Sequence, residues 1–470
     1  MKSRRITLIG AGLVGALLAT LLAQRGFKVT AFERRADPRK AGFLGGRSIN
    51  LALAERGWHG LRVAGMQERL RAIAVMMRGR MIHDLAGNTN LQRYGRDDSE
   101  VIWSVSRGAL NMALLDAAEA AGVSVHFERS LSAVDWADMR LDFLDLDGRS
   151  HAGHADILIG ADGAGSALRV AMAQKTGLGE RFEPLGHGYK ELVIPALKDF
   201  PAGAVADSLR SADRFGGQYA MEPHALHIWP RGNYMCIALP NAEGSFTVTL
   251  FLPNEGEPSL ASVVTAADAR ALFQRDFADA VPLIPDLGED YVGNPTGLLG
   301  TLYLDRWHLD GRAVLVGDAA HAIVPFHGQG MNCGFEDAVE LADLLEASPD
   351  DSASVFAEFE RRRKPNADAI AVMALENYIE MRDRVDDADY LLMRELDRAL
   401  AERHPGRWAP RYWMVTFSRM PYRTAFERGE IQTGLLRELT AGQTRLADID
   451  LGAADARIVE VLDPFVPESA

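Results

Sequence analysis

A glycine-rich turn near the start of the chain limits what it can fold into more than any other feature. Gly10, Gly12 and Gly15 stand between a β-rich run, 5–9, and a helical pattern, and the next apolar run ends at Glu33. The first glycine permits a tight turn, the second lets the backbone approach a pyrophosphate, and the third allows close packing. The N-terminus of the helix offers free N–H groups to phosphate. This order predicts a Rossmann-type dinucleotide site in which Glu33 accepts hydrogen bonds from ribose hydroxyls.

The same segment has a second interpretation. Lys2, Arg4 and Arg5 precede an uncharged stretch, 6–23, which is typical of a signal peptide or a membrane span. Glycine inside a helix costs about 1 kcal/mol, so the three glycines disfavour this interpretation. No other stretch approaches the length of a span, and 457–470 contains none. We therefore expect a cytoplasmic protein without a membrane anchor.

Composition excludes several other classes. The 470 residues carry 51 Lys and Arg against 65 Asp and Glu, a net charge of −14, which disfavours nucleic acid as a partner and fits a monomer or a homodimer. The two cysteines, Cys236 and Cys333, are too few for a disulfide framework or a thiolate metal site, and they fit a reducing compartment. The length allows two or three domains.

Two later apolar strands end in aspartate. Asp162-Gly163 follows the run 155–160 and Asp318 follows the run 312–317, at the strand ends where ligands of open α/β sheets bind. If only one of these aspartates were present, it could simply cap the helix that follows and bind no ligand. Together with the glycine turn, the two strands resemble the three-point grip of the single-component FAD-dependent aromatic hydroxylases. That resemblance implies a tightly bound FAD and two co-substrates, NADPH and O2. Because the chain has no second GxGxxG, NADPH would bind transiently and without a Rossmann domain of its own.

The segment after Asp318 is glycine-rich and leads into a predicted helix. Backbone N–H groups near Met331 and Asn332 would stabilise the negative charge of a reduced flavin. His321 and His327 are interpreted as loop residues packing near the ring, with a metal ligand or a general base as the alternative. We assign no metal and no catalytic side chain, because the flavin carries the chemistry; His327 is kept as a possible supporting residue.

The resemblance also implies which residues contact the cofactor. They are Gly10, Gly12, Val14, Gly15, Glu33, Arg34, Ala52, Arg107, Leu131, Asp162, Gly163, Asp318, Gly330, Met331 and Asn332.

Longer blocks narrow the resemblance to the members of this family that hydroxylate kynurenine. These blocks are 46–53, 76–81, 94–104, 325–332, 375–381 and 410–418. The implied reaction converts L-kynurenine to 3-hydroxy-L-kynurenine with O2, through a flavin C4a-hydroperoxide. The positions that match those holding the amino acid group of the substrate are Arg80, Tyr94, Asn377 and Tyr412. The positions that match the cavity wall are Phe246, Phe326, Glu380 and Met381.

The chemistry of these residue types suits such a ligand. A buried arginine binds a carboxylate through two parallel hydrogen bonds, and a planar aromatic group needs an apolar slot. Two alternatives stay open, namely an FAD hydroxylase of another aromatic acid and a flavin- or dinucleotide-binding protein without turnover. A plain NAD dehydrogenase is disfavoured by the two aspartate motifs.

The predicted fold is α/β, with a Rossmann-type FAD-binding domain, an antiparallel substrate-binding sheet and a helical C-terminal region. The alternation in 245–252 is typical of a half-buried strand, and further strands are expected at 187–194, 224–229 and 233–239. The expected ranges are 1–70, 101–180 and 286–345 for the FAD-binding domain, 71–100 and 181–285 for the substrate domain, and 346–470 for the helical region.

Overall fold

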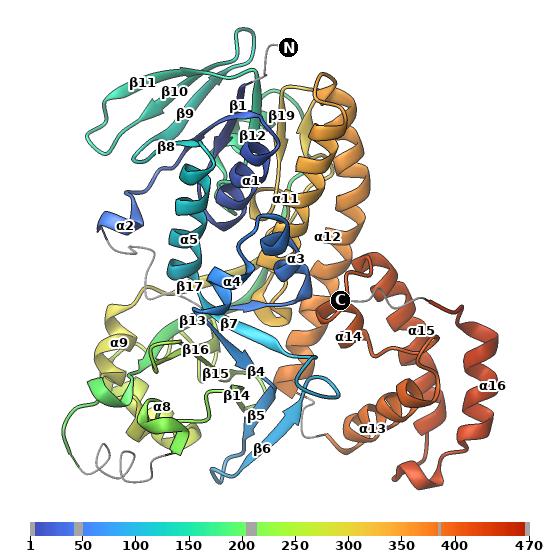
Figure 1. Ribbon diagram of the computed structural model, residues 1–470. Coiled ribbons are helices and arrows are strands. Elements are labelled where there is room, and N and C mark those ends of the chain that lie inside the picture. Colours follow the sequence, from blue (N-terminus) through green and yellow to red (C-terminus); the bar gives the residue numbers. More distant parts are fainter. Residues whose placement is uncertain (1–4, 42–49, 204–213, 384–386, 466–470) are drawn as a thin grey trace.

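The computed structural model describes residues 5–41, 50–203, 214–383 and 387–465. Part of the 46–53 block and the C-terminal residues 466–470 lie outside the described residues. Three bodies make up the fold: a parallel sheet with its helices, a larger mixed sheet, and a group of C-terminal helices (Figure 1).

The parallel sheet is built around the first strand of the chain. Strand β1 (Arg5–Ile9) pairs in parallel with β2 (Lys28–Phe32) and β12 (Ile157–Gly160). The strand order is β18-β19-β12-β1-β2-β8, and the β18–β19 pair is antiparallel. The remaining strands are β8 (Ser124–His126), β18 (His308–Leu309) and β19 (Ala313–Leu315). This arrangement confirms the predicted Rossmann-type sheet.

Helices and a small sheet surround the parallel sheet. Helix α1 (Leu13–Gln24) packs against α5 (Arg107–Ala120) and α11 (Gly330–Ala347). Residues 15–22 of α1 are all buried, so this helix lies at the centre of the core. A three-stranded sheet lies beside β2, where the Phe32 and Phe143 rings stack with centroids 4.1 Å apart. Its strands are β9 (Ser130–Asp135), β10 (Arg140–Leu144) and β11 (Ser150–His154).

The larger sheet has seven strands in the order β17-β13-β16-β15-β14-β5-β6. Its pairs are antiparallel, except that β14 and β5 run parallel. The strands are β5 (Gly79–His83), β6 (Thr89–Arg93), β13 (Arg181–Ile194), β14 (Ala225–Pro230), β15 (Met235–Pro240), β16 (Phe246–Pro253) and β17 (Gly297–Tyr303).

One strand differs from the expected ranges. Strand β17 pairs with β13 in the larger sheet, although 286–345 was assigned to the FAD-binding domain. Helix α9 (Leu287–Gly293) also packs against α8 (Ala266–Asp276) beside this sheet. The chain returns to the parallel sheet at β18. The division into domains otherwise stays a prediction.

Short elements connect the two large sheets. A second three-stranded sheet has the order β3-β7-β4. The strands are β3 (Asn50–Leu53), β4 (Ala74–Met77) and β7 (Ile102–Ser106). The helices are α2 (Pro38–Ala41), α3 (Glu55–Val63), α4 (Gln67–Arg71), α6 (Ala167–Ala173) and α10 (Asp318–His321).

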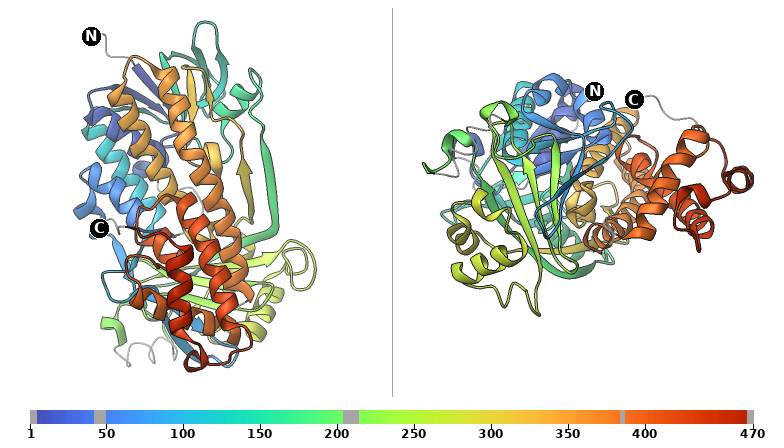
Figure 2. Two further views of the ribbon diagram at one scale, coloured as in Figure 1. Left: turned by 90° about the vertical axis from the view of Figure 1, so that its right-hand side faces the viewer. Right: turned by 90° about the horizontal axis from the view of Figure 1, so that it is seen from below.

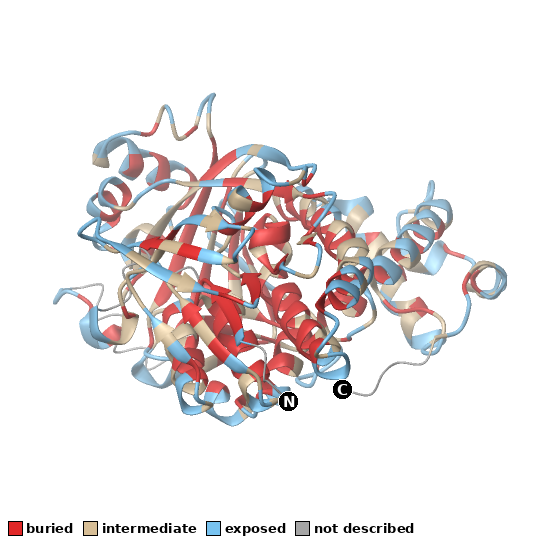
Figure 3. Ribbon diagram, turned by 90° about the horizontal axis from the view of Figure 1, so that it is seen from above, coloured by how far each residue is buried: buried red, intermediate tan, exposed pale blue. Residues whose placement is uncertain are grey.

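The last quarter of the chain is helical, as predicted. Helix α12 (Ser352–Asp383) is long and runs beside both large sheets, where it contacts β18 and β14 (Figure 2). The others are α13 (Ala388–Arg403), α14 (Arg411–Thr416), α15 (Tyr422–Thr440) and α16 (Leu451–Val461). Helices α13, α15 and α16 share a small apolar core of their own. Figure 3 shows exposed residues dominating this outer part, while buried residues gather around the sheets. Among the described residues, no helix has the length and apolar character needed to cross a membrane.

Candidate active site

A cavity of about 720 Å³ lies between the two large sheets. One end is formed by the glycine turn and by the carboxyl ends of β1, β12 and β19, and the other by one face of the larger sheet and by Tyr412. Ligands of open α/β sheets bind at such strand ends. The predicted residues that line the cavity are Gly10, Gly12, Val14, Glu33, Arg34, Ala52, Arg80, Tyr94, Arg107, Leu131, Asp162, Gly163, Asp318, Phe326, His327, Gly330, Met331, Met381 and Tyr412.

The glycine turn leaves its backbone open to the cavity. Gly10 has a φ of +97°, and a Cβ there would lie 2.5 Å from the Ala161 carbonyl oxygen. A Cβ on Gly15 would lie 2.1 Å from the Gly10 oxygen, so Gly15 serves packing and does not line the cavity. A Cβ on Gly12 would meet no atom within 4 Å. The turn therefore leaves space for a ligand at Gly12 alone among the three.

Glu33 is held in place at the adenosine end of the predicted site. Its carboxylate accepts hydrogen bonds from the backbone N–H of Ala11 at 2.9 Å and of Arg35 at 3.0 Å. It lines the cavity beside Arg34 and Leu131. The acid at the end of β2 thus braces the glycine turn and still faces the space that a ribose would fill.

The two aspartates after the apolar strands differ in their contacts. Asp162 accepts hydrogen bonds from the backbone N–H of Ala167 at 2.7 Å and of Leu168 at 3.2 Å, and from the Ser166 hydroxyl. These contacts are those of the capping alternative. Burial raises the pKa of Asp162 in spite of these bonds. Asp318 lies at the first position of α10 on the cavity wall, so its carboxylate is the better placed of the two to bind a ligand hydroxyl.

The turn before α11 is fixed from behind by Asn332. Its Oδ1 accepts a hydrogen bond from Ala54 N at 3.0 Å, and its Nδ2 donates to the carbonyls of Ala52 at 2.8 Å and Gly328 at 2.7 Å. The side chain is fully buried and does not line the cavity, whereas Gly330 and Met331 do. Asn332 therefore holds this turn in shape.

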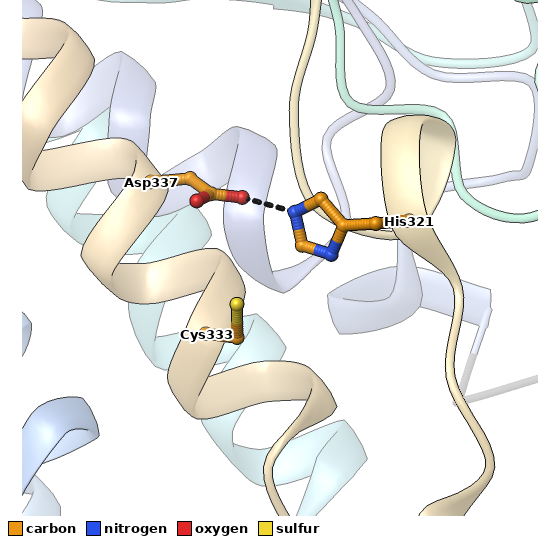
Figure 4. Close-up of side chains that lie close together, drawn as sticks. All are labelled: His321, Cys333 and Asp337. Atoms are coloured by element: carbon orange, nitrogen blue, oxygen red, sulfur yellow. Dashed lines mark hydrogen bonds and ion pairs between the residues drawn. The ribbon is translucent and has the colours of Figure 1, made fainter. Parts of the chain in front are cut away.

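His321 lies behind the Asp318 turn together with two residues of α11. Its Nε2 is 2.6 Å from Asp337 Oδ2, and Cys333 stands one turn away on the same helix face (Figure 4). Such a trio has the composition of a metal site, which sequence spacing did not indicate. However, the guanidinium of Arg363 donates to Asp337 at 2.7 Å and contacts Cys333 Sγ at 3.5 Å. The guanidinium cation of Arg363 is therefore already bound to two of the three groups that would ligate a metal.

This cluster positions the cofactor side of the cavity. Asp337 Oδ2 also accepts the backbone N–H of Gly317 at 3.1 Å, immediately before Asp318. Burial alone would raise the pKa of Asp337, but its electrostatic interactions and hydrogen bonds with His321 and Arg363 outweigh burial and lower this pKa to about 2. Burial raises the pKa of the Cys333 thiol well above its usual value. The acid is therefore charged and the thiol protonated at neutral pH.

At the other end of the cavity, Arg80 lies among aromatic rings. The Tyr94 and Tyr412 rings stack with centroids 5.5 Å apart, and the Arg80 guanidinium carbon lies 5.3 Å from the Tyr412 ring centre. Arg80 Nε and Tyr94 Oη are buried without a hydrogen-bond partner in the described parts of the chain. Burial raises the pKa of both phenols, so they stay protonated. Unmatched buried donors of this kind indicate a missing acceptor.

Asn377 and Glu380 lie behind Arg80 and do not line the cavity. Arg80 Nη2 lies 3.4 Å from Asn377 Oδ1, and its Nη1 lies 3.4 Å from Glu380 Oε1. Tyr390 on α13 donates a hydrogen bond to the same Glu380 oxygen at 2.5 Å. Direct contact of these two residues with the substrate was expected, but the structure places them as supports of the arginine.

The apolar wall differs from expectation at Phe246. Residues of β16 alternate between the two faces of the sheet, as in any strand. Phe246 is fully buried with the residues of α8 and α9, on the face opposite the cavity. Thr249 and Phe251 face the cavity instead, and Phe251 contacts Phe326 with ring centroids 5.0 Å apart. Phe251 therefore replaces Phe246 as the aromatic wall residue.

Sequence reasoning missed most of the sheet's contribution to the wall. The odd-numbered positions that it supplies are Tyr189, Ile237, Leu239, Thr249, Phe251 and Leu299. The alternation of β16 was visible in the sequence, but it does not show which face is turned to the cavity. His327 also lines the wall, stacked on Tyr412 at 5.5 Å, and burial lowers its pKa to about 4. It is a neutral ring at pH 7.

Comparison with known proteins identifies the family of this chain. The FAD binding domain family model matches residues 4–224 and 296–374. Kynurenine 3-monooxygenase of Xanthomonas axonopodis pv. citri is 58% identical over 466 residues, which are 99% of this chain and 98% of the relative. Kynurenine 3-monooxygenase of Stenotrophomonas maltophilia is 56% identical over 97% of this chain and 96% of its own length.

Solved structures share the fold at lower identity. The 2-methyl-3-hydroxypyridine-5-carboxylic acid oxygenase superposes with a TM-score of 0.64 at 21% identity, covering 83% of this chain and 96% of its own. PqsL of Pseudomonas aeruginosa, solved with 2-aminobenzoylacetate, gives a TM-score of 0.62 at 21% identity, covering 81% of this chain and 97% of its own. Because its relatives match along nearly their whole length, the chain belongs to the kynurenine 3-monooxygenase family of FAD-dependent flavoprotein monooxygenases.

Proposed function

We propose that this protein hydroxylates L-kynurenine to 3-hydroxy-L-kynurenine with FAD, consuming NADPH and O2. One observation carries the proposal: the cavity joins an open glycine turn at one end to an arginine and a tyrosine with unmatched buried donors at the other. The names of the relatives support the same reaction.

The residues at the first end fit FAD. The open face of Gly12 gives a pyrophosphate access to backbone N–H groups at the start of α1, where the helix dipole favours negative charge. Glu33 would bind the adenosine ribose, and Asp318 would bind a hydroxyl of the ribityl chain. When bound, the flavin would supply the redox chemistry, namely acceptance of a hydride from NADPH, activation of O2 and transfer of one oxygen atom.

The residues at the second end fit an α-amino acid. Arg80 Nε and the Tyr94 hydroxyl would donate hydrogen bonds to the carboxylate of kynurenine, which would give both buried donors an acceptor. Glu380 and Asn377 hold the guanidinium in position from behind. Since Glu380 and Asn377 do not line the cavity, they leave the Nε of Arg80 free to bind the carboxylate.

The wall between the two ends excludes water from the aromatic ring of the substrate. Phe251, Phe326 and Met381 supply apolar surface there. The amino group of kynurenine already makes its ring electron-rich, so the reaction needs no strong general base. His327 is neutral and stacked on Tyr412, and we assign it to shaping the cavity.

The test follows NADPH oxidation in air by the purified, FAD-loaded protein, with and without L-kynurenine, and weighs the product. We expect faster oxidation with kynurenine and a product heavier by one oxygen atom. Faster oxidation without oxygen transfer would make kynurenine an effector of flavin reduction. No acceleration would refute the proposal and direct the search to other aromatic acids or to a binding function.

We also propose a cytoplasmic location and a monomeric or homodimeric state. Both cysteines are buried and unpaired, which fits a reducing compartment. Fractionation of cells that produce the protein and sedimentation of the purified enzyme would test the two statements.

A further inference from the structure

A fully buried arginine links the C-terminal helices to the core. Arg56 on α3 has 1% of its surface exposed. Its Nε donates to the Val415 carbonyl at 2.9 Å and its Nη2 to that of Met414 at 3.3 Å, while Nη2 also donates to Met420 O. These carbonyls belong to the end of α14 and to the loop before α15. Arg56 therefore fixes the C-terminal end of the helix that carries Tyr412.

A tyrosine continues this link toward the cavity. The Tyr422 ring, at the first position of α15, lies 3.8 Å from the Arg56 guanidinium carbon. Its hydroxyl donates to Gln329 Oε1 at 2.7 Å, and both side chains are buried. Gln329 immediately precedes Gly330 and Met331, which line the cofactor end of the cavity.

An ionic branch reaches the second cofactor turn. Arg56 Nη1 binds Glu336 Oε1 at 2.7 Å, and Glu336 Oε2 binds Arg363 at 3.1 Å. Arg363 in turn binds Asp337, which accepts the N–H of Gly317. One residue thus connects, through two branches, both turns of the cofactor end with the helix of Tyr412.

We propose that Arg56 and Tyr422 are positioning residues that couple the cofactor turn 327–332 to the substrate-binding helix α14. Neither residue lines the cavity. With the link intact, the His327 and Tyr412 rings, one from each side, stay stacked before any ligand binds. Without the link, FAD must order the turn 327–332 and the substrate must order α14, and each ordering step reduces the free energy of binding. This inference rests on the proposed function for its substrate, but its structural part does not.

The decisive variant removes one hydroxyl. Tyr422→Phe deletes the bond to Gln329 and keeps the ring on Arg56. Tyr291→Phe is the matched control, because Tyr291 is equally buried, its hydroxyl donates to Val263 O at 2.8 Å, and neither residue lines the cavity. Arg56→Lys is the second variant; it keeps the charge beside Glu336 and loses the fork of hydrogen bonds to the carbonyls.

Three measurements separate positioning from plain stability. They are the Kd of the apoprotein for FAD, KM and kcat with L-kynurenine, and hydrogen exchange of the backbone amides 328–333. For Tyr422→Phe we expect both Kd and KM to rise about five-fold, kcat to stay within about two-fold, and exchange to accelerate. Arg56→Lys should shift the same quantities in the same direction. Tyr291→Phe should lower the melting temperature and change none of the three.

The outcomes distinguish this inference from the proposed function. Equal behaviour of Tyr422→Phe and Tyr291→Phe in all three measurements would overturn the link. If Tyr422→Phe does not fold, Arg56→Lys decides by the same comparison. If the wild-type protein does not act on kynurenine, the proposed function fails, and FAD affinity together with amide exchange still decides whether the link exists.

Discussion

Arg80, which is buried, and Glu380, which is half-buried, form an ion pair with Nη1 3.4 Å from Oε1, and the Nε of the arginine has no partner among the described residues. Glu380 stabilises the buried positive charge of Arg80 and holds its guanidinium, a hydrogen-bond donor, in place. A carboxylate that enters the cavity meets a guanidinium already held in one orientation, so little conformational entropy is lost on binding.

Arg80→Ala should therefore raise KM for kynurenine while FAD stays bound. Loss of a charge-assisted pair of hydrogen bonds costs about 3 kcal/mol, which corresponds to roughly a 100-fold rise in KM. Steady-state kinetics and flavin absorbance of the purified variant measure both effects. Arg78→Ala is the control, since Arg78 pairs with Asp98 near the surface. An unchanged KM would remove Arg80 from the site.

Phe251→Ala and Phe246→Ala should separate substrate binding from stability. Phe246 is packed with α8 and α9, so its truncation should lower the free energy of unfolding by about 3–5 kcal/mol and leave KM close to normal. Phe251 faces the cavity, and its truncation should raise KM roughly ten-fold through lost aromatic contact. Chemical denaturation and kinetics of the two variants give the comparison. The reverse pattern would return Phe246 to the wall.

Gly12→Ala should affect FAD and not the fold. A Cβ at Gly12 meets open space, so the melting temperature of the apoprotein should stay within about 2 °C of the wild type, while FAD affinity falls at least about ten-fold because the new methyl group occupies the pyrophosphate position. Gly10→Ala should instead destabilise the apoprotein itself, because of its positive φ and the nearby Ala161 carbonyl. Thermal scans and FAD titration of both apoproteins test this. Normal FAD affinity in Gly12→Ala would place the cofactor elsewhere.

Acid should remove the stabilisation that Asp337 supplies. Its pKa falls from 3.8 to about 2 on folding, so the folded state binds its proton less readily than the unfolded state. The contribution, about 2 kcal/mol, is complete above pH 5 and is lost as the pH falls through 4 toward 2. Urea denaturation at a series of pH values should show a steeper loss of stability below pH 4 for the wild type than for Asp337→Asn. Parallel pH profiles would contradict the assignment.

The local features of the cofactor end could be predicted from the sequence. The spacing of Gly10, Gly12 and Gly15 and the position of Glu33 depend on one strand, one turn and one helix, and the structure has the first strand at the predicted residues, 5–9, with a helix and a second strand after it. Parallel pairing of β12 and β19 beside β1 follows from their apolar character. Such features depend on residues that are close in the sequence, so they can be predicted without knowing the tertiary structure.

Features that depend on distant pairing could not be predicted in the same way. Strand β5, which carries Arg80, lies in the larger sheet by parallel pairing with β14, and nothing local in either strand specifies this. The face that Phe246 takes depends on where α8 and α9 pack. Cys333 and Asp337 are four residues apart and so share a helix face, but the approach of His321 from α10 is a tertiary event.

The substrate end is assembled from strands and helices that lie far apart along the chain. Arg80 belongs to β5, Phe251 to β16, and Tyr412 to α14, which follows both large sheets. Contacts of this range close slowly, because a long loop must be ordered before any contact is gained. During synthesis, the glycine turn can therefore form while the amino acid pocket still lacks one wall. Recognition of the substrate therefore needs a longer stretch of chain than the glycine turn does, and a product stopped before α14 would retain the glycine turn and lack Tyr412.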